Sequence, residues 1–200
     1  GIALFYAGLV RRKNVVNTMV AVFAVAAVVA LTWFALGYSL AFSKSSAWLG
    51  GLDRAWFSSM RLDAAAGTVS VSHLAPHLPE SLYALFPMAF AVITTTLIIG
   101  AVVERMRFSA LLLFSALWSV LVYAPVAHWV WESDGWLNKL GALDFAGGAV
   151  VHVNAGVSAL VCAAMLGRRQ GYGRQAFEPH SLGWTAMGAA PVRAGGSWSG

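Results

Sequence analysis

Charged residues are scarce in this sequence. Only 10% of its 200 residues are Asp, Glu, Lys or Arg, while 59% are hydrophobic, and a soluble domain carries about 25% charged residues. The chain is long enough to bury a core, but it has too few charges to cover one. This composition excludes an ordinary soluble globular domain.

The sequence also lacks a second cysteine, and its first residues do not have the pattern of a signal peptide. Cys162 is the only cysteine, so no disulfide can form within the chain. The sequence opens with the apolar stretch Gly1–Val10 and meets its first basic residue at Arg11. A signal peptide would begin with basic residues and end at a small-residue cleavage site, so this beginning is not typical of one.

Long charge-free blocks are what the sequence does contain. Each of four blocks exceeds the roughly 20 residues that a helix needs to cross a bilayer. They are Asn14–Ser43 with 30 residues, Ser81–Val103 with 23, Phe108–Trp131 with 24 and Phe145–Gly167 with 23. We predict an all-α, polytopic bundle of transmembrane helices in a cell membrane, either a plasma membrane or a bacterial inner membrane.

The basic residues indicate the orientation. Eight of them lie in the alternate connections that fall on one side of the predicted membrane, against four in two longer loops on the other side. The eight are Arg11, Arg12, Lys13, Arg105, Arg107, Arg168, Arg169 and Arg174, and the four are Lys44, Arg54, Arg61 and Lys139. This bias places the first group in the cytoplasm. The net charge of +5 therefore reflects topology, and we expect no nucleic-acid partner.

Both ends are shorter than a membrane span. Gly1–Val10 would cross only half a bilayer, and the last charge-free segment, Ser181–Val192, has 12 residues. We expect part of a longer protein, with half of a first span, complete spans 2–5 and the start of a sixth.

Several side chains are candidates for function, each with a plainer alternative. Phe86 and Phe90 share one helical face with Thr94, which suits either a pore or ordinary packing, and Pro87 could kink their helix. In the outer loop, His73 and His77 are four residues apart and could face one way on a helix. They are weak evidence for a metal site, since a third ligand is missing and the prolines nearby disfavour a helix.

The segment Leu143–Leu160 combines a histidine with small residues in an apolar span. Asp144 precedes the span and offers the acceptor and the negative charge that a helix N-terminus favours. His152 lies on one stripe with Gly148 and Gly156, so we expect it to face the bundle interior, because small residues let neighbouring helices approach. Ionisable residues within spans are functional candidates, but a histidine satisfied by a partner in the bundle explains the pattern equally well.

An intramembrane serine enzyme is an alternative for the same span. Ser158, in the motif Gly156–Ala159, is six residues from His152, about 240° around the helix axis, so the two cannot form a hydrogen-bonded dyad. His128 lies at the opposite end of its own helix. We therefore expect no enzyme, no cofactor and no metal.

Five stretches of the sequence resemble, in order, the ammonium transporters, the family of ammonia channels related to the Rh proteins. They are GIALFYAGLVRRKN, GAVVERMRFSA, YAPVAHWVW, GALDFAGGAVVHVNAG and GYGRQAFEPHSL, beginning at Gly1, Gly100, Tyr123, Gly141 and Gly171. The resemblance extends to about Met187. It implies a partial transporter domain over residues 1–187 and an atypical tail, frame-shifted or truncated, over residues 188–200.

The resemblance also implies roles for individual residues. Trp131 would recognise the cation at the outer mouth, with Phe90 and Asp144 beside it. Phe86 and Phe90 would form a gate of two stacked rings, and His152 would be the first of two pore histidines. Ammonium would lose a proton before neutral ammonia crosses the pore of each protomer. The partners would be ammonium or ammonia, the lipid bilayer, two further copies in a homotrimer that serves nitrogen uptake, and a cytoplasmic regulatory protein.

The sequence departs from the family in several places. The second pore histidine, the serine and a further aromatic residue of the outer site would lie beyond the end of this chain, and Pro87 separates the two gate rings unusually. An ammonium sensor with the same fold, which would need a signalling extension, and a gene fragment without function are the remaining alternatives.

Overall fold

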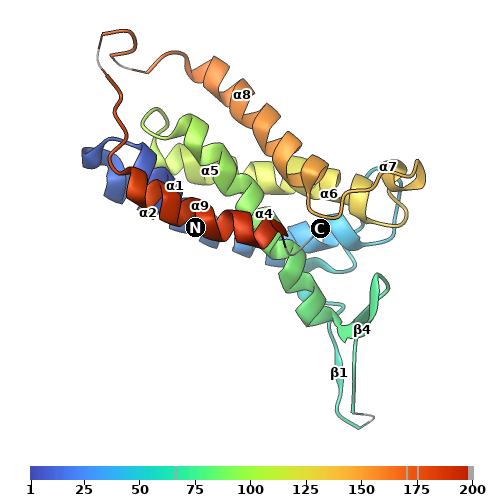
Figure 1. Ribbon diagram of the computed structural model, residues 1–200. Coiled ribbons are helices and arrows are strands. Elements are labelled where there is room, and N and C mark those ends of the chain that lie inside the picture. Colours follow the sequence, from blue (N-terminus) through green and yellow to red (C-terminus); the bar gives the residue numbers. More distant parts are fainter. Residues whose placement is uncertain (66, 170, 175, 198–200) are drawn as a thin grey trace.

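The helices form one bundle with a long outer loop projecting from it (Figure 1). The computed structural model describes residues 1–65, 67–169, 171–174 and 176–197. Within this part of the chain, four segments are long and apolar enough to cross a membrane: Arg12–Phe42, Glu80–Val102, Phe108–Lys139 and Gly148–Leu166. The four predicted spans and the polytopic membrane architecture are confirmed.

The first half of the bundle comprises α1 (Ile2–Leu9), α2 (Val15–Thr32), α3 (Tyr38–Phe42) and α4 (Glu80–Val102). A π-helical turn, Trp33–Gly37, joins α2 to α3 without a break in the span. Pro87 lies inside α4, which nevertheless runs as one helix. In lipid an unpaired backbone group is costly, so a continuous hydrogen-bonded helix is the expected form of each charge-free block.

The second half contains α5 (Phe108–Trp118), α6 (Ala124–Trp131), α7 (Trp136–Lys139), α8 (Asn154–Leu166) and α9 (Leu182–Ser197). A π-helical turn, Ser119–Tyr123, connects α5 to α6, and another, Gly148–Val153, opens the span that continues as α8. Helix α8 lies along one side of the bundle (Figure 1). Residues 188–197 of the expected tail continue α9, while residues 198–200 lie outside the described part.

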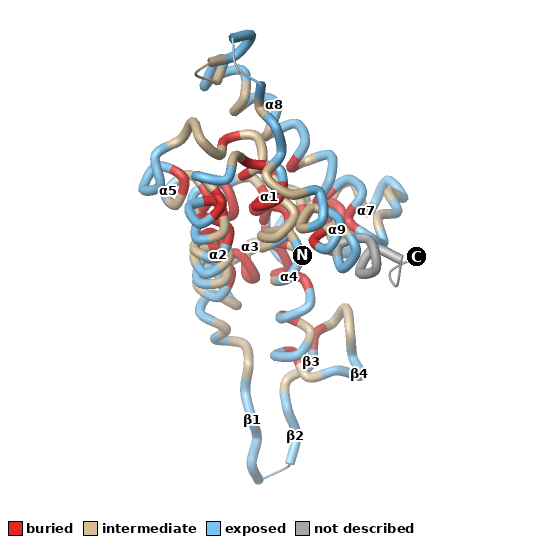
Figure 2. Tube along the Cα trace, turned by 60° about the vertical axis from the view of Figure 1, so that its left-hand side comes forward, coloured by how far each residue is buried: buried red, intermediate tan, exposed pale blue. Residues whose placement is uncertain are grey.

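The outer loop contains the strands of the fold. Strands β1 (Leu62–Asp63) and β2 (Thr68–Val69) pair antiparallel, and so do β3 (Val71–Ser72) and β4 (Ala75–Pro79). The β1–β2 hairpin is exposed and extends away from the buried bundle (Figure 2). These strands are too short to leave a period-two pattern in the sequence.

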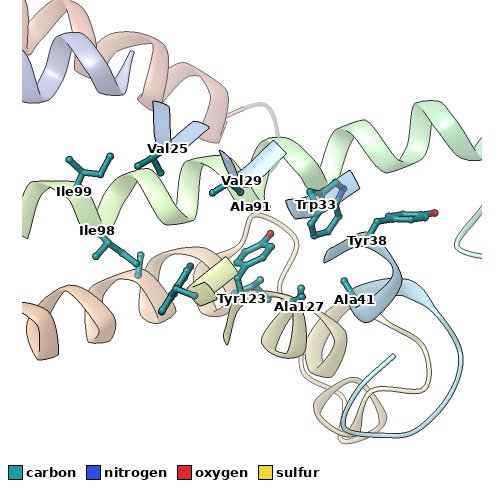
Figure 3. Packing of buried hydrophobic residues seen from close by; sticks show 14 of the residues in the cluster. Val25, Val29, Trp33, Tyr38, Ala41, Ala91, Ile98, Ile99, Tyr123 and Ala127 are labelled. Atoms are coloured by element: carbon teal, nitrogen blue, oxygen red, sulfur yellow. The ribbon is translucent and has the colours of Figure 1, made fainter. Parts of the chain in front are cut away.

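Aromatic and small side chains together fill the core. Trp33, Tyr38 and Tyr123 are each at most 2% exposed and lie among Val29 and Ala91 (Figure 3). The Trp33 indole donates a hydrogen bond to the Ala84 carbonyl at 3.1 Å. The core therefore lies where α2, α4 and the α5–α6 span meet.

Helices α1 and α9 approach each other closely at two glycines. A Cβ on Gly8 would lie 2.2 Å from Thr185 Oγ1, and one on Gly188 would lie 2.2 Å from the Phe5 nitrogen. Ser181 also donates a backbone hydrogen bond to the Gly8 carbonyl at 3.0 Å. Small residues at this contact allow the backbones to touch.

The predicted grouping of the basic connections is confirmed at one end of the bundle. Arg11 pairs with Glu104 at 3.3 Å, and Arg105 donates to the Gly167 carbonyl at 2.6 Å, directly before Arg168. The basic connections therefore gather at the same end.

Candidate functional site

Two helix segments, a loop and a helical turn bring the candidate side chains to the opposite end. Helix α4 carries Phe86 and Phe90, and α6 ends at Trp131. Asp144 lies in the loop after α7, and His152 lies in the π-helical turn Gly148–Val153. Residues separated by more than sixty positions thus meet around one location.

The rings form a chain of edge contacts. The centroids of Phe86 and Phe90 are 5.2 Å apart with an interplanar angle of 85°, and those of Phe90 and Trp131 are 5.6 Å apart at 60°. Edge-to-face contact is favourable because the positive edge of one ring meets the negative face of the other. The expectation of two stacked phenylalanine rings is wrong in its geometry, since the four-residue spacing on α4 sets the rings one above the other without making their planes parallel.

Phe86 and Phe90 differ in burial. Phe86 is 64% exposed, while Phe90 is half-buried and contacts Trp131. Phe90 is therefore the ring that links the outer tryptophan to α4.

Asp144 holds the beginning of the fifth span. Its carboxylate accepts hydrogen bonds from the backbone N–H groups of Gly148, of Ala149 at 3.0 Å and of Val150 at 2.9 Å. These donors belong to the first helical turn, where backbone N–H groups have no partner within the helix. The hydrogen bonds expected for Asp144 are present, although the helical segment starts at Gly148, later than the predicted Phe145.

Gly147 explains that later start. Its φ of 77° is left-handed, and a Cβ there would lie 2.5 Å from Val151 Cγ2. Only glycine adopts this conformation without strain. The backbone therefore turns sharply at Gly147 and lets the Asp144 side chain reach back over the end of the helix.

The backbone of Asp144 makes a second contact. The Trp131 indole nitrogen donates a hydrogen bond to the Asp144 carbonyl at 2.7 Å. This bond fixes the indole, since the indole N–H is the only donor of that side chain. This bond could not be predicted from the sequence, because its acceptor is a main-chain atom.

His152 lies beside an apolar cleft. The cleft has a volume of about 590 Å³, and its lining includes His152, Phe86 and Phe90 together with residues of α1 and α2, among them Ile2, Val22 and Phe23. His152 Nδ1 lies 3.2 Å from the Gly147 carbonyl. The α1 and α2 residues of this lining were not predicted from the sequence, because nothing distinguishes them from other apolar residues of a span.

The face of the span that carries His152 lines the cleft but is not covered by packing within this chain, so its place in the bundle interior stays a prediction. Gly148, His152 and Gly156 are all exposed, whereas the buried positions in this region are Val150, Val151 and Ala155. The stripe of small residues therefore does not pack on the bundle, and His152 borders the cleft on an open side of the chain. A span that is apolar on every face does not reveal which face its neighbours cover.

The other histidines and Ser158 are placed elsewhere. His73 pairs with Glu132 at 2.8 Å, and His77 is exposed. Among the described residues, no group of three or more His, Cys, Asp or Glu side chains could hold a metal ion. Ser158 accepts a hydrogen bond from the Trp118 indole at 3.1 Å, a contact that joins α5 to α8.

Comparison with known proteins gives consistent matches. A family model described as Ammonium Transporter Family matches residues 1–195. An ammonium transporter of Bacillus subtilis is 47% identical, a match covering 96% of this chain and 45% of that protein.

Solved structures match in the same way. A crystal structure of Mep2 from Candida albicans is similar with a TM-score of 0.81 and 36% identity, covering 97% of this chain and 42% of that one. A structure described as a sensor Amt protein has a TM-score of 0.81 at 25% identity, covering 96% and 47% of the two chains. This chain thus spans less than half the length of these relatives.

Proposed function

We propose, from the premise that this chain belongs to the ammonium transporter family, that it forms part of a pathway carrying ammonium or ammonia across a cell membrane. Its relatives are named as transporters and not as enzymes. The observation that supports a site within this chain is the contact chain from Trp131 through Phe90 to the cleft beside His152.

The outer step of the proposed pathway is recognition of the cation. An ammonium ion on the face of Trp131 or Phe90 would gain about 0.5–2 kcal/mol from the ring quadrupole, more as water is removed. The Trp131–Asp144 bond holds the indole in place. Asp144 acts here as a positioning residue, because its carboxylate is occupied by three backbone donors of the helix.

The second step is loss of a proton before passage. Transfer of a bare ammonium ion into hydrocarbon carries a prohibitive cost, of order tens of kcal/mol, whereas neutral ammonia avoids this cost. The cleft beyond Phe90 is lined chiefly by apolar side chains. His152 suits such a lumen, since a neutral imidazole can donate or accept a hydrogen bond without a fixed charge.

A chimera tests this proposal. Residues 1–187 of this chain would replace the matching segment of the Bacillus subtilis transporter, and uptake of methylammonium into cells lacking other transporters would be measured. We expect saturable uptake that falls strongly in a His152→Ala chimera with an unchanged membrane level. A membrane-inserted chimera without uptake, or uptake that is indifferent to His152→Ala, would contradict the proposed pathway.

A sensor is the second candidate, because a sensor Amt protein has the same fold at 25% identity. Binding of ammonium by the chimera without transport would favour it. We further propose that the whole protein assembles as a homotrimer with a cytoplasmic regulatory partner. Crosslinking of the protein in native membranes tests both, with a trimer and a mixed species as the expected products.

A further inference from the structure

One arginine joins the inner ends of α4 and of the span that carries His152. Arg105 follows α4, and its Nη2 donates a hydrogen bond to the Ala101 carbonyl in the last turn of that helix. Its Nη1 donates to two carbonyls at the end of α8, that of Gly167 at 2.6 Å and that of Ala163 at 3.4 Å. A single side chain therefore connects the C-terminal ends of two helices.

These carbonyl groups are suitable partners for a cation. The last four carbonyls of a helix have no partner within the helix, and the helix dipole adds partial negative charge there. A guanidinium group carries several donors in a rigid planar fork, so its two terminal nitrogens can serve two helices at once. The Arg105 Nε is buried and, within the described part of the chain, has no hydrogen-bond partner. The side chain thus lies between the two helix ends.

Helix α8 is only lightly buried, which makes this bridge important. Ala155 is its buried residue, and Ala159 packs against the core in part. Near the middle of the helix, the Trp118 indole donates a hydrogen bond to Ser158. In lipid, an apolar side chain gains little by exchanging acyl chains for another helix, so close packing and polar bonds decide how helices associate. We therefore expect the Arg105 bridge to determine where the inner half of α8 lies.

The position of α8 in turn affects the cleft. Helices α4 and α8 pack side by side, and α8 continues directly from the π-helical turn that carries His152. Phe90 and Ile93 of α4 line the cleft together with Val151 and His152 of that turn. The separation of the two helices therefore sets the width of the cleft between α4 and His152.

We propose that Arg105 is a positioning residue, which joins the inner ends of α4 and α8, fixes their separation and so holds His152 at its place opposite Phe90. Arg105 lies at the end of the bundle opposite to Trp131, so it acts on the pathway only through the helices. The importance of the cleft rests on the proposed function, whereas the position of α8 does not.

Distances between spin labels test the position of α8. Nitroxides would be attached at Met165→Cys on α8 and Val20→Cys on α2, two exposed positions, with the native cysteine removed by Cys162→Ser. Helix α2 packs against α4 and serves as the reference. Pulsed electron paramagnetic resonance of the 200-residue chain in lipid nanodiscs gives the distribution of distances. We expect Arg105→Gln to broaden this distribution and lengthen its mean, because one short neutral amide cannot bridge both helix ends.

Two further variants make the test specific. Arg105→Lys keeps the positive charge but replaces the fork by one compact ammonium group, so it should broaden the distribution less than Arg105→Gln. Arg107→Gln removes an exposed arginine of the same connection and is the matched control, which should give the distribution of the parent chain. If Arg105→Gln does not insert into nanodiscs, the comparison of Arg105→Lys with Arg107→Gln decides the test.

Uptake by the chimera tests the consequence for the pathway. A displaced α8 moves His152 but leaves the contact between Phe90 and Trp131 in place. Arg105→Gln should therefore lower the maximal rate of methylammonium uptake and leave the KM unchanged. We expect a loss of roughly tenfold or more, since a misplacement of about 1 Å can cost about a hundredfold in an enzyme. Arg107→Gln should change neither quantity at an equal membrane level.

Several outcomes overturn the proposal. They are a parent-like distance distribution in Arg105→Gln, an equal broadening in Arg107→Gln, and a raised KM without a loss of rate. A parent-like distribution in Arg105→Lys would assign the effect to charge alone and overturn the bridge. Since the distances are measured without any transport step, a failure there leaves the proposed transport function untouched. Conversely, an unsubstituted chimera that fails to transport leaves the distance result standing.

Discussion

Asp144 binds two neighbouring segments, one through its carboxylate and one through its main-chain carbonyl. Its carboxylate accepts the free N–H groups of the helix that carries His152, and its carbonyl accepts the Trp131 indole. A substitution at this position removes only the first set of bonds directly. The bond to the Trp131 indole is affected indirectly, because the carboxylate holds the loop against the helix.

Replacement of Asp144 by alanine should therefore lower stability. The loss of a helix cap costs about 0.5–2 kcal/mol, which lowers the melting temperature of a chain of this size by a few degrees. Thermal unfolding of the chain in detergent measures this, with Asp134→Ala as the control, because the Asp134 side chain is 42% exposed and pairs with the exposed Lys139. Equal melting temperatures for both variants would contradict the capping role.

Substitution of Phe90 can distinguish a role in packing from a role in recognising the cation. Replacement by alanine should raise the KM for methylammonium in the chimera roughly two- to thirtyfold, because a cation–π contact contributes about 0.5–2 kcal/mol. The ring is only half-buried, so we expect the helix content to be preserved. Leu85→Ala, a position on the same helix that is 50% exposed, is the control. An unchanged KM would indicate that Phe90 has only a packing role.

The helix ends on the basic side are joined by another carboxylate. Burial raises the pKa of Glu104, but hydrogen bonds from Asn14 and Arg11, together with the charges of Arg11 and Arg169, outweigh it and hold the pKa below its ordinary value. Glu104 also has a positive φ of 70°, an uncommon backbone state for a residue other than glycine. The contacts of its side chain therefore hold the turn that connects α4 to α5.

The sign of the Glu104 shift gives a pH prediction. A carboxyl group whose pKa is lower in the folded than in the unfolded chain adds stability above its ordinary range, and this is lost as the pH falls through the folded value. Glu104→Gln should destabilise the chain at neutral pH, and the difference from wild type should shrink below about pH 4.3. Unfolding midpoints across this range test it, with the exposed Glu178→Gln as the control. A difference that is constant with pH would refute the assignment.

The whole chain leaves its candidate pathway open on one side. His152 and Phe86 are exposed, so the cleft that they help to line is open where they lie. Ammonia transport depends on a dry lumen, which an open cleft does not provide. The resemblance to the family assigns the second histidine to a segment outside this sequence.

We therefore expect no transport by the 200-residue chain alone. The purified chain would be reconstituted in liposomes, and ammonium-driven pH changes and currents would be recorded, with the chimera as the positive control. The leak should match that of empty liposomes. Specific and saturable transport would show that the described residues suffice.

The number and length of the spans, and which of their ends lie together, followed from the sequence alone. Charge-free blocks predicted the spans to within a few residues, apart from the third, whose apolar segment continues past Trp131 through α7 to Lys139. The basic clusters predicted which ends lie together, as the Arg11–Glu104 and Arg105–Gly167 contacts show. A charge in hydrocarbon is costly wherever it points. Composition along the chain is therefore enough to place the boundaries of a span.

The rotation of each helix and the contacts between distant segments were decided by the tertiary structure. The buried face beside His152, the edge-to-face rings, the Trp131–Asp144 bond and the His73–Glu132 pair were not predictable. A helix that is apolar on every side has no pattern that selects one face, and a bond to a main-chain carbonyl depends on no particular side chain. Such features arise only when segments far apart in the chain are packed together.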